Sequence, residues 1–496
     1  MKSKILLLFL LFSTQLTAQI RRDAVWCFGD SVQIDFNQSP PVISNCAIRT
    51  RGTACSITDS LGNILFYCQS FHRPTGSINE KMGCVFNKMN QIMENGDTLV
   101  ANGWYHEMQI IPNPANSNQY YIFHTGVTIN PELYYSVIDM SYNNGLGKVI
   151  QKNILLNNLN GEYPTDNLIA IKHGNGRDYW LLLKSYFNYN DSIHRYLISD
   201  QGISSEVIQR IGFTPSSGII RFFFNNSGSK MVLVSASGLL EYYDFDRCTG
   251  LLSNRIQINP ETQIPADFFW SAAFSPNDSV LYVTVDDTLN CLFQYELFAS
   301  NISNSRQLIH SFYFPYYGSG DLRLAINGKI YWGIAYDDGN GYNFPYADTT
   351  YNSINMNLSV INQPNQLGAA CDFQPYSFYL GGYRTYYGLG INPNYDLGPV
   401  VGSACDSLTN SVAETVEQKT FSIYPNPAHN QVQLQWQDYH ATEIKIFNSF
   451  GEINLPSKIS WNVNGCTFSV ESFLPGVYFV QVKTDKTLLI RKLMVQ

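Results

Sequence analysis

The chain has 496 residues and a formal net charge of −8, and only 14% of its residues are charged, against ~25% in typical soluble domains. The negative charge and the lack of a basic cluster exclude nucleic acid as a partner. Aromatic residues reach 14%, including 33 Tyr and 30 Phe, which favour strands, and no 3.6-residue apolar stripe predicts a long helix. We therefore expect an all-β protein with one large and one small domain.

A secretory signal peptide is predicted at residues 1–18. Lys2 and Lys4 precede an apolar run at 5–12, and residues 17–18 supply small side chains for cleavage. This run is too short to cross a membrane, and no later stretch reaches the ~18 apolar residues that a transmembrane helix requires. No Cys follows the cleavage region directly, which argues against a lipid anchor. The sequence therefore predicts an exported protein with no transmembrane segment.

Hairpin-like segments recur through residues 20–382. Each has an apolar run, a turn of Gly, Asn, Asp or Pro, and a second run of aromatic or β-branched residues. Their turn centres are 54, 60, 52, 50 and 50 residues apart, at Gly62, Asn116, Gly176, Gly228, Asp278 and Gly328. A period near 50 indicates a β-propeller, because each blade is a four-stranded sheet that must stack against its neighbours. Residues 274–282, FSPNDSVLY, also resemble the blade hairpin of secreted bacterial propellers.

Seven blades are favoured, and six remain an alternative. The repeat that follows Leu322 falls on 370–380, with no room for another whole blade before the Gly- and Pro-rich residues 383–420, which we interpret as a linker. The strand-like runs at 25–28 and 32–36 have no repeat of their own. We expect them to pair with 370–380 and close the ring as a composite blade. An open β-sandwich or a β-solenoid is the alternative architecture.

Candidate ligand-binding residues stand where the innermost strands begin. In a propeller these positions surround one mouth of the central channel, so residues from several blades meet there. Such a set of carboxylates, guanidinium groups and an indole suits a sugar or peptide ligand, or acid and base chemistry. Alternatively, the groups pair with one another and close the channel. The set is His106, Glu107, Asp166, Arg221, Trp270, Asp321 and Arg323.

Cys55 and Cys68 are placed symmetrically about residues 61–62. A two-residue hairpin turn would make them direct cross-strand neighbours. They then form either a disulfide or two unpaired buried thiols, since free Cys is often buried.

No cofactor or metal is expected. The chain has no Cys-x-x-Cys pair, and Ile110 stands where a zinc-protease helix beginning at His106 and Glu107 would need its second His. No phosphate loop, nucleophile elbow or dinucleotide pattern occurs. Residues 337–343 alternate oxygen-bearing side chains as calcium loops do, but a plain hairpin loop is the favoured interpretation.

A small Ig-like β-sandwich is predicted at residues 421–496. Apolar residues at 432, 434 and 436 alternate with four Gln residues, the period of a strand with one buried face. Three further pieces, YPNP at 424–427, LPGVYFVQV at 474–482 and KLMV at 492–495, resemble in this order the type A C-terminal sorting domain of proteins exported by the type IX secretion system. The residues that carry the resemblance are Tyr424, Pro425, Asn426, Pro427, Pro475, Gly476, Tyr478, Lys492, Leu493 and Val495.

The resemblance implies a destination rather than an activity. It implies handling by the type IX machinery, passage through the periplasm and across the outer membrane, and then release or attachment to surface polysaccharide. A binding or interaction protein for a polysaccharide or protein ligand is the favoured function. A propeller-type glycan hydrolase or lyase, using Glu107 with Asp166 or Asp321, is one alternative. A structural component of the cell-surface layer is another.

Overall fold

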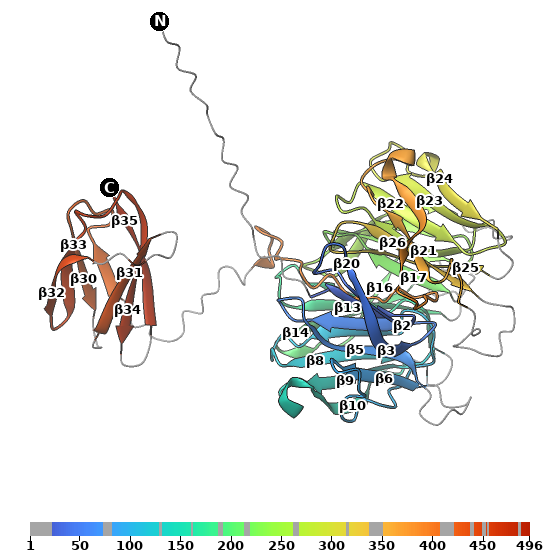
Figure 1. The fold of residues 1–496 in the computed structure, drawn as a ribbon, viewed down its shortest axis with the longest axis horizontal. Coiled ribbons are helices and arrows are strands. Elements are labelled where there is room, and N and C mark those ends of the chain that lie inside the picture. The colour runs from blue at the N-terminus through green and yellow to red at the C-terminus, as the bar shows by residue number, and fades with distance from the viewer. Residues whose placement is uncertain are drawn as a thin grey trace, which may run out of the picture. The chain divides into compact units, whose positions relative to one another are not determined.

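The computed structural model separates the chain into two units, Met1–Leu408 and Thr409–Gln496, and each is described by itself (Figure 1). The predicted signal peptide at 1–18 and the loop at 337–343 lie outside the described residues. These are 22–72, 82–127, 131–159, 162–186, 192–212, 219–260, 267–313, 317–336, 351–406, 421–436, 441–448, 453, 456–484 and 488–496.

The described strands of the first unit form seven antiparallel sheets. Sheet one is β1 (Val25–Phe28), β2 (Asp30–Asp35) and β3 (Val42–Arg49). Sheet two is β4 (Ala54–Thr58), β5 (Ile64–His72) and β6 (Met82–Asn87). Sheet three is β7 (Met108–Pro112), β8 (Gln119–Thr125), β9 (Leu133–Asp139) and β10 (Lys148–Asn157). Sheet four is β11 (Tyr163–Pro164), β12 (Ile169–Lys172), β13 (Tyr179–Tyr186), β14 (Ser192–Ser199), β15 (Gly202–Ile203) and β16 (Val207–Arg210).

The remaining three sheets have four strands each. Sheet five is β17 (Ile220–Phe224), β18 (Lys230–Ser235), β19 (Leu240–Asp246) and β20 (Leu251–Asn259). Sheet six is β21 (Phe269–Phe274), β22 (Val280–Val285), β23 (Asn290–Glu296) and β24 (Gln307–Phe312). Sheet seven is β25 (Tyr317–Leu324), β26 (Ile330–Tyr336), β27 (Asn357–Ile361) and β28 (Phe373–Tyr379). Among the described residues, three short 3-10 helices lie between strands, η1 (Asn143–Gly145), η3 (Ser303–Ser305) and η5 (Gly368–Cys371).

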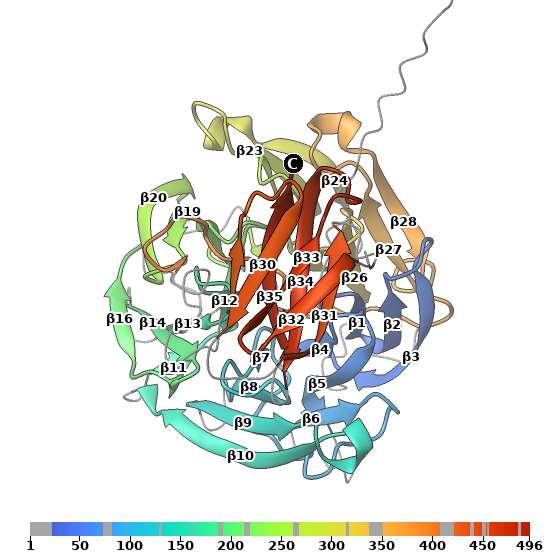
Figure 2. The same ribbon diagram turned by 90° about the vertical axis from the view of Figure 1, so that its left-hand side faces the viewer.

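The seven sheets are the blades of a β-propeller (Figure 2). Their innermost strands contact one another in order: β1 with β4, then β7, β12, β17, β21 and β25. The inner strand β21 is buried along its whole length, whereas the outer strand β20 is mostly exposed, because only the outer edge of a blade faces water. The fold and the favoured seven blades are confirmed.

The predicted composite blade is wrong. The strand at 373–379, β28, pairs with β27, while β1 and β2 complete their own sheet with β3. The ring closes instead by packing between the first and last blades. Trp26 meets Tyr331 edge to face with ring centroids 5.8 Å apart, and Arg323 forms an ion pair with Asp23 at 2.6 Å. A strand from the other end is unnecessary, because β3 supplies the third strand that the N-terminal pair needed.

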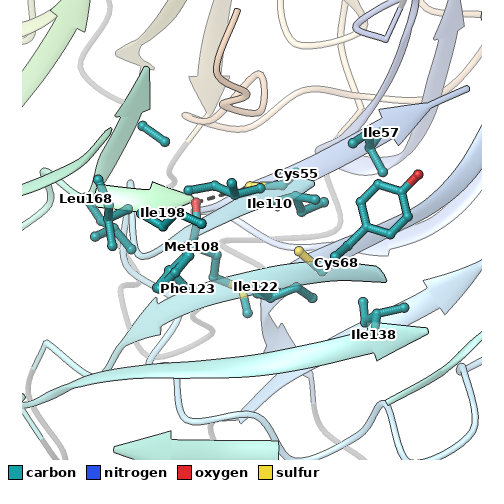
Figure 3. Packing of buried hydrophobic residues seen from close by; sticks show 14 of the residues in the cluster. Cys55, Ile57, Cys68, Met108, Ile110, Ile122, Phe123, Ile138, Leu168 and Ile198 are labelled. Atoms are coloured by element: carbon teal, nitrogen blue, oxygen red, sulfur yellow. Dashed lines mark hydrogen bonds between the residues drawn. The ribbon is translucent and has the colours of Figure 1, made fainter. Parts of the chain in front are cut away.

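Cys55 and Cys68 are direct cross-strand neighbours, as predicted, but they are not joined by a disulfide. The Cys55 thiol donates to the carbonyl oxygen of Met108 in the next blade, with 3.2 Å between sulfur and oxygen (Figure 3). Figure 3 shows both thiols among apolar side chains from the second, third and fourth blades. The alternative of two buried free thiols holds.

Residues 383–406 pack onto the propeller, so the predicted linker starts too early. This segment, the C-terminal strap, follows the last strand and crosses the ring. Backbone hydrogen bonds tie its N–H groups at Gly388, Ile391 and Val400 to carbonyl oxygens of three different loops and strands, at Arg51, Ala54 and Gly174. Its far end is joined to the fifth blade by a disulfide between Cys248 and Cys405, 157 residues apart, which the sequence analysis missed.

The second unit is a small β-sandwich, as predicted. One sheet contains β29 (Phe421–Tyr424), β30 (Gln431–Trp436), β33 (Gly465–Ser469) and β32 (Ser457–Asn462), in that order. The other contains β31 (Ala441–Asn448), β34 (Gly476–Thr484) and β35 (Leu488–Val495). In β30 the apolar residues are buried and the Gln residues exposed, which is the alternation expected from the sequence.

The Asn426 side chain connects the YPNP turn to the last strand of this sandwich. Its amide nitrogen donates to the carbonyl oxygen of Lys492 at 2.9 Å, and its oxygen accepts from the backbone N–H of Met494 at 2.8 Å. The backbone of Ala428 continues the same pairing with Met494 and Gln496. The two motifs that resemble a sorting signal are therefore one structural feature, although 66 residues separate Asn426 from Lys492.

Candidate functional site

An aromatic plug closes the channel where the innermost strands begin. Trp270, at the start of β21, contacts the rings of Tyr105 and Tyr387 at centroid distances of 4.9 and 5.0 Å. The guanidinium of Arg221 lies over the indole of Trp270, 3.7 Å from the ring centre, and 4.8 Å from that of Tyr105. All four side chains are buried. The plug combines two blades, the loop before β7 and the strap.

Arg221 also neutralises a buried carboxylate. Its guanidinium lies 3.5 Å from the Asp166 carboxylate, and its Nη1 donates to the carbonyl oxygen of Trp270 at 2.6 Å. Burial raises the pKa of Asp166 to about 7, although the positive charge of Arg221 opposes this shift. Arg221 therefore pairs with both Asp166 and the backbone of Trp270 at this end of the channel.

Glu107 is bound by its own loop. Its carboxylate accepts the backbone N–H groups of Asn102, Gly103 and Trp104 at 2.9 to 3.3 Å, and the residue has no exposed surface. Burial and the neighbouring Asp166 raise the pKa of Glu107 to about 8, against these donors, which favour the ionised form. Glu107 holds the loop that carries Tyr105 and is closed off from a substrate.

The Arg323 side chain joins the two ends of the ring. Its two terminal nitrogens donate to Asp23 at 2.6 Å and to the carbonyl oxygen of Leu389 in the strap at 2.8 Å, and its guanidinium lies 4.2 Å from the centre of the Trp26 ring. One side chain thus joins the last blade, the N-terminal segment and the strap.

Beyond the plug, the channel opens into a cavity of about 850 Å³. Its walls are the inner strands β12, β17, β21 and β25 and strap residues 390–398. The walls combine apolar groups, including aromatic side chains from β17, with polar side chains that include His106, Gln109, Asn225 and Asn392. The volume lies within the ~300–1,000 Å³ of sites that bind small molecules.

Only some of the predicted site residues reach this cavity. Those that line it are His106, Asp321 and Arg323, whereas Glu107, Asp166, Arg221 and Trp270 lie in or behind the plug. The predicted convergence of these positions occurs, but the opening is at the other end of the inner strands. There the side chains are Asn225, Asn226, Pro276 and the turn residues around Gly328.

Two polar residues at the deep end, at positions 106 and 109, have side-chain nitrogen and oxygen atoms without a hydrogen-bond partner in the protein. Both ring nitrogens of His106, and both the nitrogen and the oxygen of the Gln109 amide, are buried without a hydrogen bond, and the two residues are 2% and 1% exposed. Burial lowers the pKa of His106 well below its usual value, so its ring is neutral. Such a group costs roughly 1–3 kcal/mol unless it is hydrogen-bonded. In a cavity of this size water or a ligand meets that requirement.

Gln109 is not among the site residues predicted from the sequence, although a signal was present. Gln109 is the one polar residue of β7, which reads Met-Gln-Ile-Ile-Pro. An amide within an otherwise apolar inner strand faces the protein core unless a cavity lies beside it. The position of Gln109 was therefore a signal for a cavity.

Among the described residues, no group of three or more His, Cys, Asp or Glu is arranged to hold a metal ion. The same part of the chain contains no helix with the length and apolar character needed to cross a membrane.

Comparison with known proteins identifies the second unit. Residues 422–496 match the family described as the secretion system C-terminal sorting domain. No curated protein sequence matches the chain. Similar solved structures include a putative 6-phosphogluconolactonase from Bacteroides fragilis, with 12% identity, 68% of this chain and 90% of that chain covered and a TM-score of 0.41. Another is the Pseudomonas aeruginosa periplasmic gluconolactonase PpgL, with 11% identity, coverage of 73% and 96% and a TM-score of 0.42.

A third is the β-propeller domain of Myceliophteria thermophila Cps50 (Swd1), with 10% identity, coverage of 63% and 93% and a TM-score of 0.37. The blades themselves are established by the order of strands in the seven sheets. The chain is a β-propeller protein that carries a type IX secretion system C-terminal sorting domain, which directs it to secretion or to the cell surface.

Proposed function

We propose that the propeller is a binding module that acts outside the cell and holds a small ligand in the channel cavity. The observation that carries this proposal is the pair His106 and Gln109, whose four polar atoms are buried without a protein partner beside a cavity of about 850 Å³. Buried polar atoms of this cost are retained in a protein when a bound molecule satisfies their hydrogen bonds.

The hydrolase alternative receives no support from its proposed residues. Glu107 is fully buried with its carboxylate bound to three backbone N–H groups, and Asp166 is paired with Arg221. Asp321 lines the cavity, but Glu107 and Asp166 do not, so neither proposed pair of carboxyl groups has access to a glycosidic bond there. Binding without bond cleavage remains the proposal.

A screen with a mouth-blocking variant tests it. Ile326 lies at the cavity rim and is partly buried, so Ile326→Trp should narrow the opening without disturbing the blades. Ligand binding to the purified protein is measured by ligand-observed NMR with a mixed library of small saccharides, amino acids, short peptides and organic acids. A matched control, Ile154→Trp, alters an exposed position of the outer strand β10.

We expect at least one compound to bind the wild type and the control but not Ile326→Trp. Binding that is equal in all three proteins would place the ligand elsewhere. A cavity that binds nothing in any class would refute the proposal.

A further inference from the structure

We propose that the cavity binds an uncharged, hydroxyl-rich ligand, a sugar at the free end of a saccharide, and that Gln109 and His106 select it. This inference rests on the proposed function and names its ligand class. It is derived from the hydrogen-bonding capacity of the deep end, the charged groups of the walls and the plug that closes one end of the channel.

The deep end offers donors and acceptors together. A Gln amide has two N–H donors and one acceptor oxygen, and a neutral His has one donor and one acceptor. A ligand that displaces water from His106 and Gln109 must reproduce both kinds of hydrogen bond. Carboxylates and phosphates only accept, and ammonium groups only donate, whereas each hydroxyl does both. The pair therefore matches neighbouring hydroxyl groups.

The charged groups of the cavity wall disfavour an anionic ligand. Asp23 is bridged by Arg323, whereas Asp321 and Asp396 each have a buried carboxyl oxygen without a hydrogen-bond partner. Arg323, the cation among the described residues that line the cavity, already donates to Asp23 and to the strap. An anionic ligand would have to break this buried pair, which is costly, and would lie near two further carboxyl groups. A cation that only donates hydrogen bonds would leave the acceptors of His106 and Gln109 without partners, so an uncharged molecule is favoured.

An aromatic surface stands next to the hydrogen-bonding groups. The ring of Phe223 on β17 meets the His106 ring edge to face, with centroids 5.4 Å apart, and Phe223 is only partly buried. A sugar ring has an apolar C–H face and a rim of hydroxyl groups, so it satisfies an aromatic ring and a polar pair at the same time. A purely apolar ligand would leave Gln109 without partners.

The plug closes the channel at one end of the cavity. The plug of Tyr105, Trp270 and Tyr387 closes the channel behind His106, while the rim at Asn226 and Gly328 lies at the opposite end of the inner strands. A ligand must enter from the rim, so the middle of a polymer cannot reach Gln109. A terminal sugar or a short free saccharide can do so.

The test separates a ligand contact from a structural one. Gln109→Met keeps the length of the side chain and removes both unpartnered polar atoms. If Gln109 serves a ligand, this variant should bind a neutral saccharide at least about tenfold more weakly, because two hydrogen bonds are lost. Its unfolding temperature should be equal to or above that of the wild type, because a buried unsatisfied group has been removed.

Gln294→Met is the matched control. Gln294 is as buried as Gln109, but its nitrogen donates to Tyr282 at 2.8 Å and its oxygen accepts the N–H of Gly368 at 2.8 Å. This variant should lower the unfolding temperature and leave saccharide affinity unchanged. His106→Asn is a second cavity variant that tolerates the positive φ of 49° at this position, and it should weaken binding in the same direction.

Calorimetry and thermal unfolding are run on the purified protein with neutral mono- to tetrasaccharides, the matching uronic acids, amino sugars and neutral peptides. Tighter binding of neutral saccharides, lost in Gln109→Met without loss of stability, supports the inference. A cavity ligand that is blocked by Ile326→Trp but is an anion, a cation or a peptide overturns the sugar assignment and leaves the proposed function intact. Destabilisation of Gln109→Met to the extent of Gln294→Met, with affinity unchanged, overturns the role of Gln109. No binding in any class overturns both.

Discussion

Arg221 and Trp270 join neighbouring blades through two contacts at once. The guanidinium of Arg221, on β17, stacks on the indole of Trp270, on β21, at 3.7 Å and donates to the carbonyl oxygen of the same residue at 2.6 Å. Cation–π contacts strengthen when both groups are removed from water, as they are here. Trp270 is therefore part of the core of the ring, and an anchor role at an exposed channel mouth is not supported.

Trp270→Ala should destabilise the propeller by about 3–5 kcal/mol, because it empties a large buried volume and exposes a charge pair. Urea unfolding followed by Tyr fluorescence measures the effect. Trp104→Ala, at a position that is 37% exposed, is the control and should cost much less. Stability close to that of the wild type would show that the plug is not structural.

The end of the propeller unit should lie after the strap. A chain that ends at residue 408 should unfold at the same temperature as the full protein, because both retain the strap. A chain that ends at residue 382 lacks the buried residues Tyr386, Leu389 and Tyr395 and should be insoluble or unfolded at 25 °C. Circular dichroism and limited proteolysis compare the two. Equal stability would restore the interpretation of 383–406 as a linker.

The disulfide should be confined to Cys248 and Cys405. Peptide mapping without reduction should link these two cysteines and show Cys55 and Cys68 as free thiols that react only after unfolding. Replacing Cys248 and Cys405 by Ser should cost about 2–5 kcal/mol, as for long loops closed by a native disulfide. Cys291→Ser, at a free thiol, should cost less. A Cys55–Cys68 crosslink in the native protein would contradict the structure.

The stability of the propeller should fall as the pH rises from about 4 to 8. Burial raises the pKa of Glu107 to about 8, that of Asp166 to about 7 and that of Asp321 to about 6. Across this range the folded state retains protons that the unfolded chain has released, so the free energy of unfolding decreases with pH. Urea midpoints at pH 5, 6.5 and 8 measure the slope.

Glu107→Gln keeps an oxygen acceptor for the loop N–H groups and cannot ionise, so it should flatten this pH dependence. A midpoint that rises between pH 5 and 8, or a slope unchanged in Glu107→Gln, would show that these carboxyl groups are ionised in the folded protein.

Asn426→Ala should loosen the last strand of the sorting domain. It removes two hydrogen bonds to the backbone of Lys492 and Met494, worth roughly 1–3 kcal/mol together. Hydrogen exchange of the β35 amides and protease accessibility on intact cells measure local stability and export, and both should change. Gln433→Ala, on the exposed face of β30, is the control.

Deleting residues 492–496 would not separate the sorting motif from the fold of the sandwich. That deletion removes the buried side chains of Leu493 and Val495, so it should unfold the sandwich as well as erase the motif. Asn426→Ala leaves these side chains in place. Normal export together with fast hydrogen exchange in β35 would show that the secretion machinery does not require the two hydrogen bonds of Asn426.

The local features of this protein depend on residues that are neighbours in the sequence. The export motifs, the alternation of β30 and the repeat of strand, turn and strand depend on successive side chains, so the sandwich and the blades could be predicted from the sequence. The pairing of Cys55 with Cys68 across a hairpin is local in the same sense. Whether the two thiols form a disulfide could not be predicted from local sequence, because it also depends on Met108 in the next blade.

The path of the strap was decided only by the tertiary structure. Its Gly and Pro residues have the composition of a linker, yet at Gly388 a Cβ atom would come within 2.5 Å of the Gly52 carbonyl oxygen, so glycine is needed there for close packing. Sequence composition does not distinguish glycine in a linker from glycine that is needed for close packing. The disulfide partner of Cys405 and the closure of the plug both depend on this irregular segment. Its contacts follow no sequence period and form only when the ring is complete.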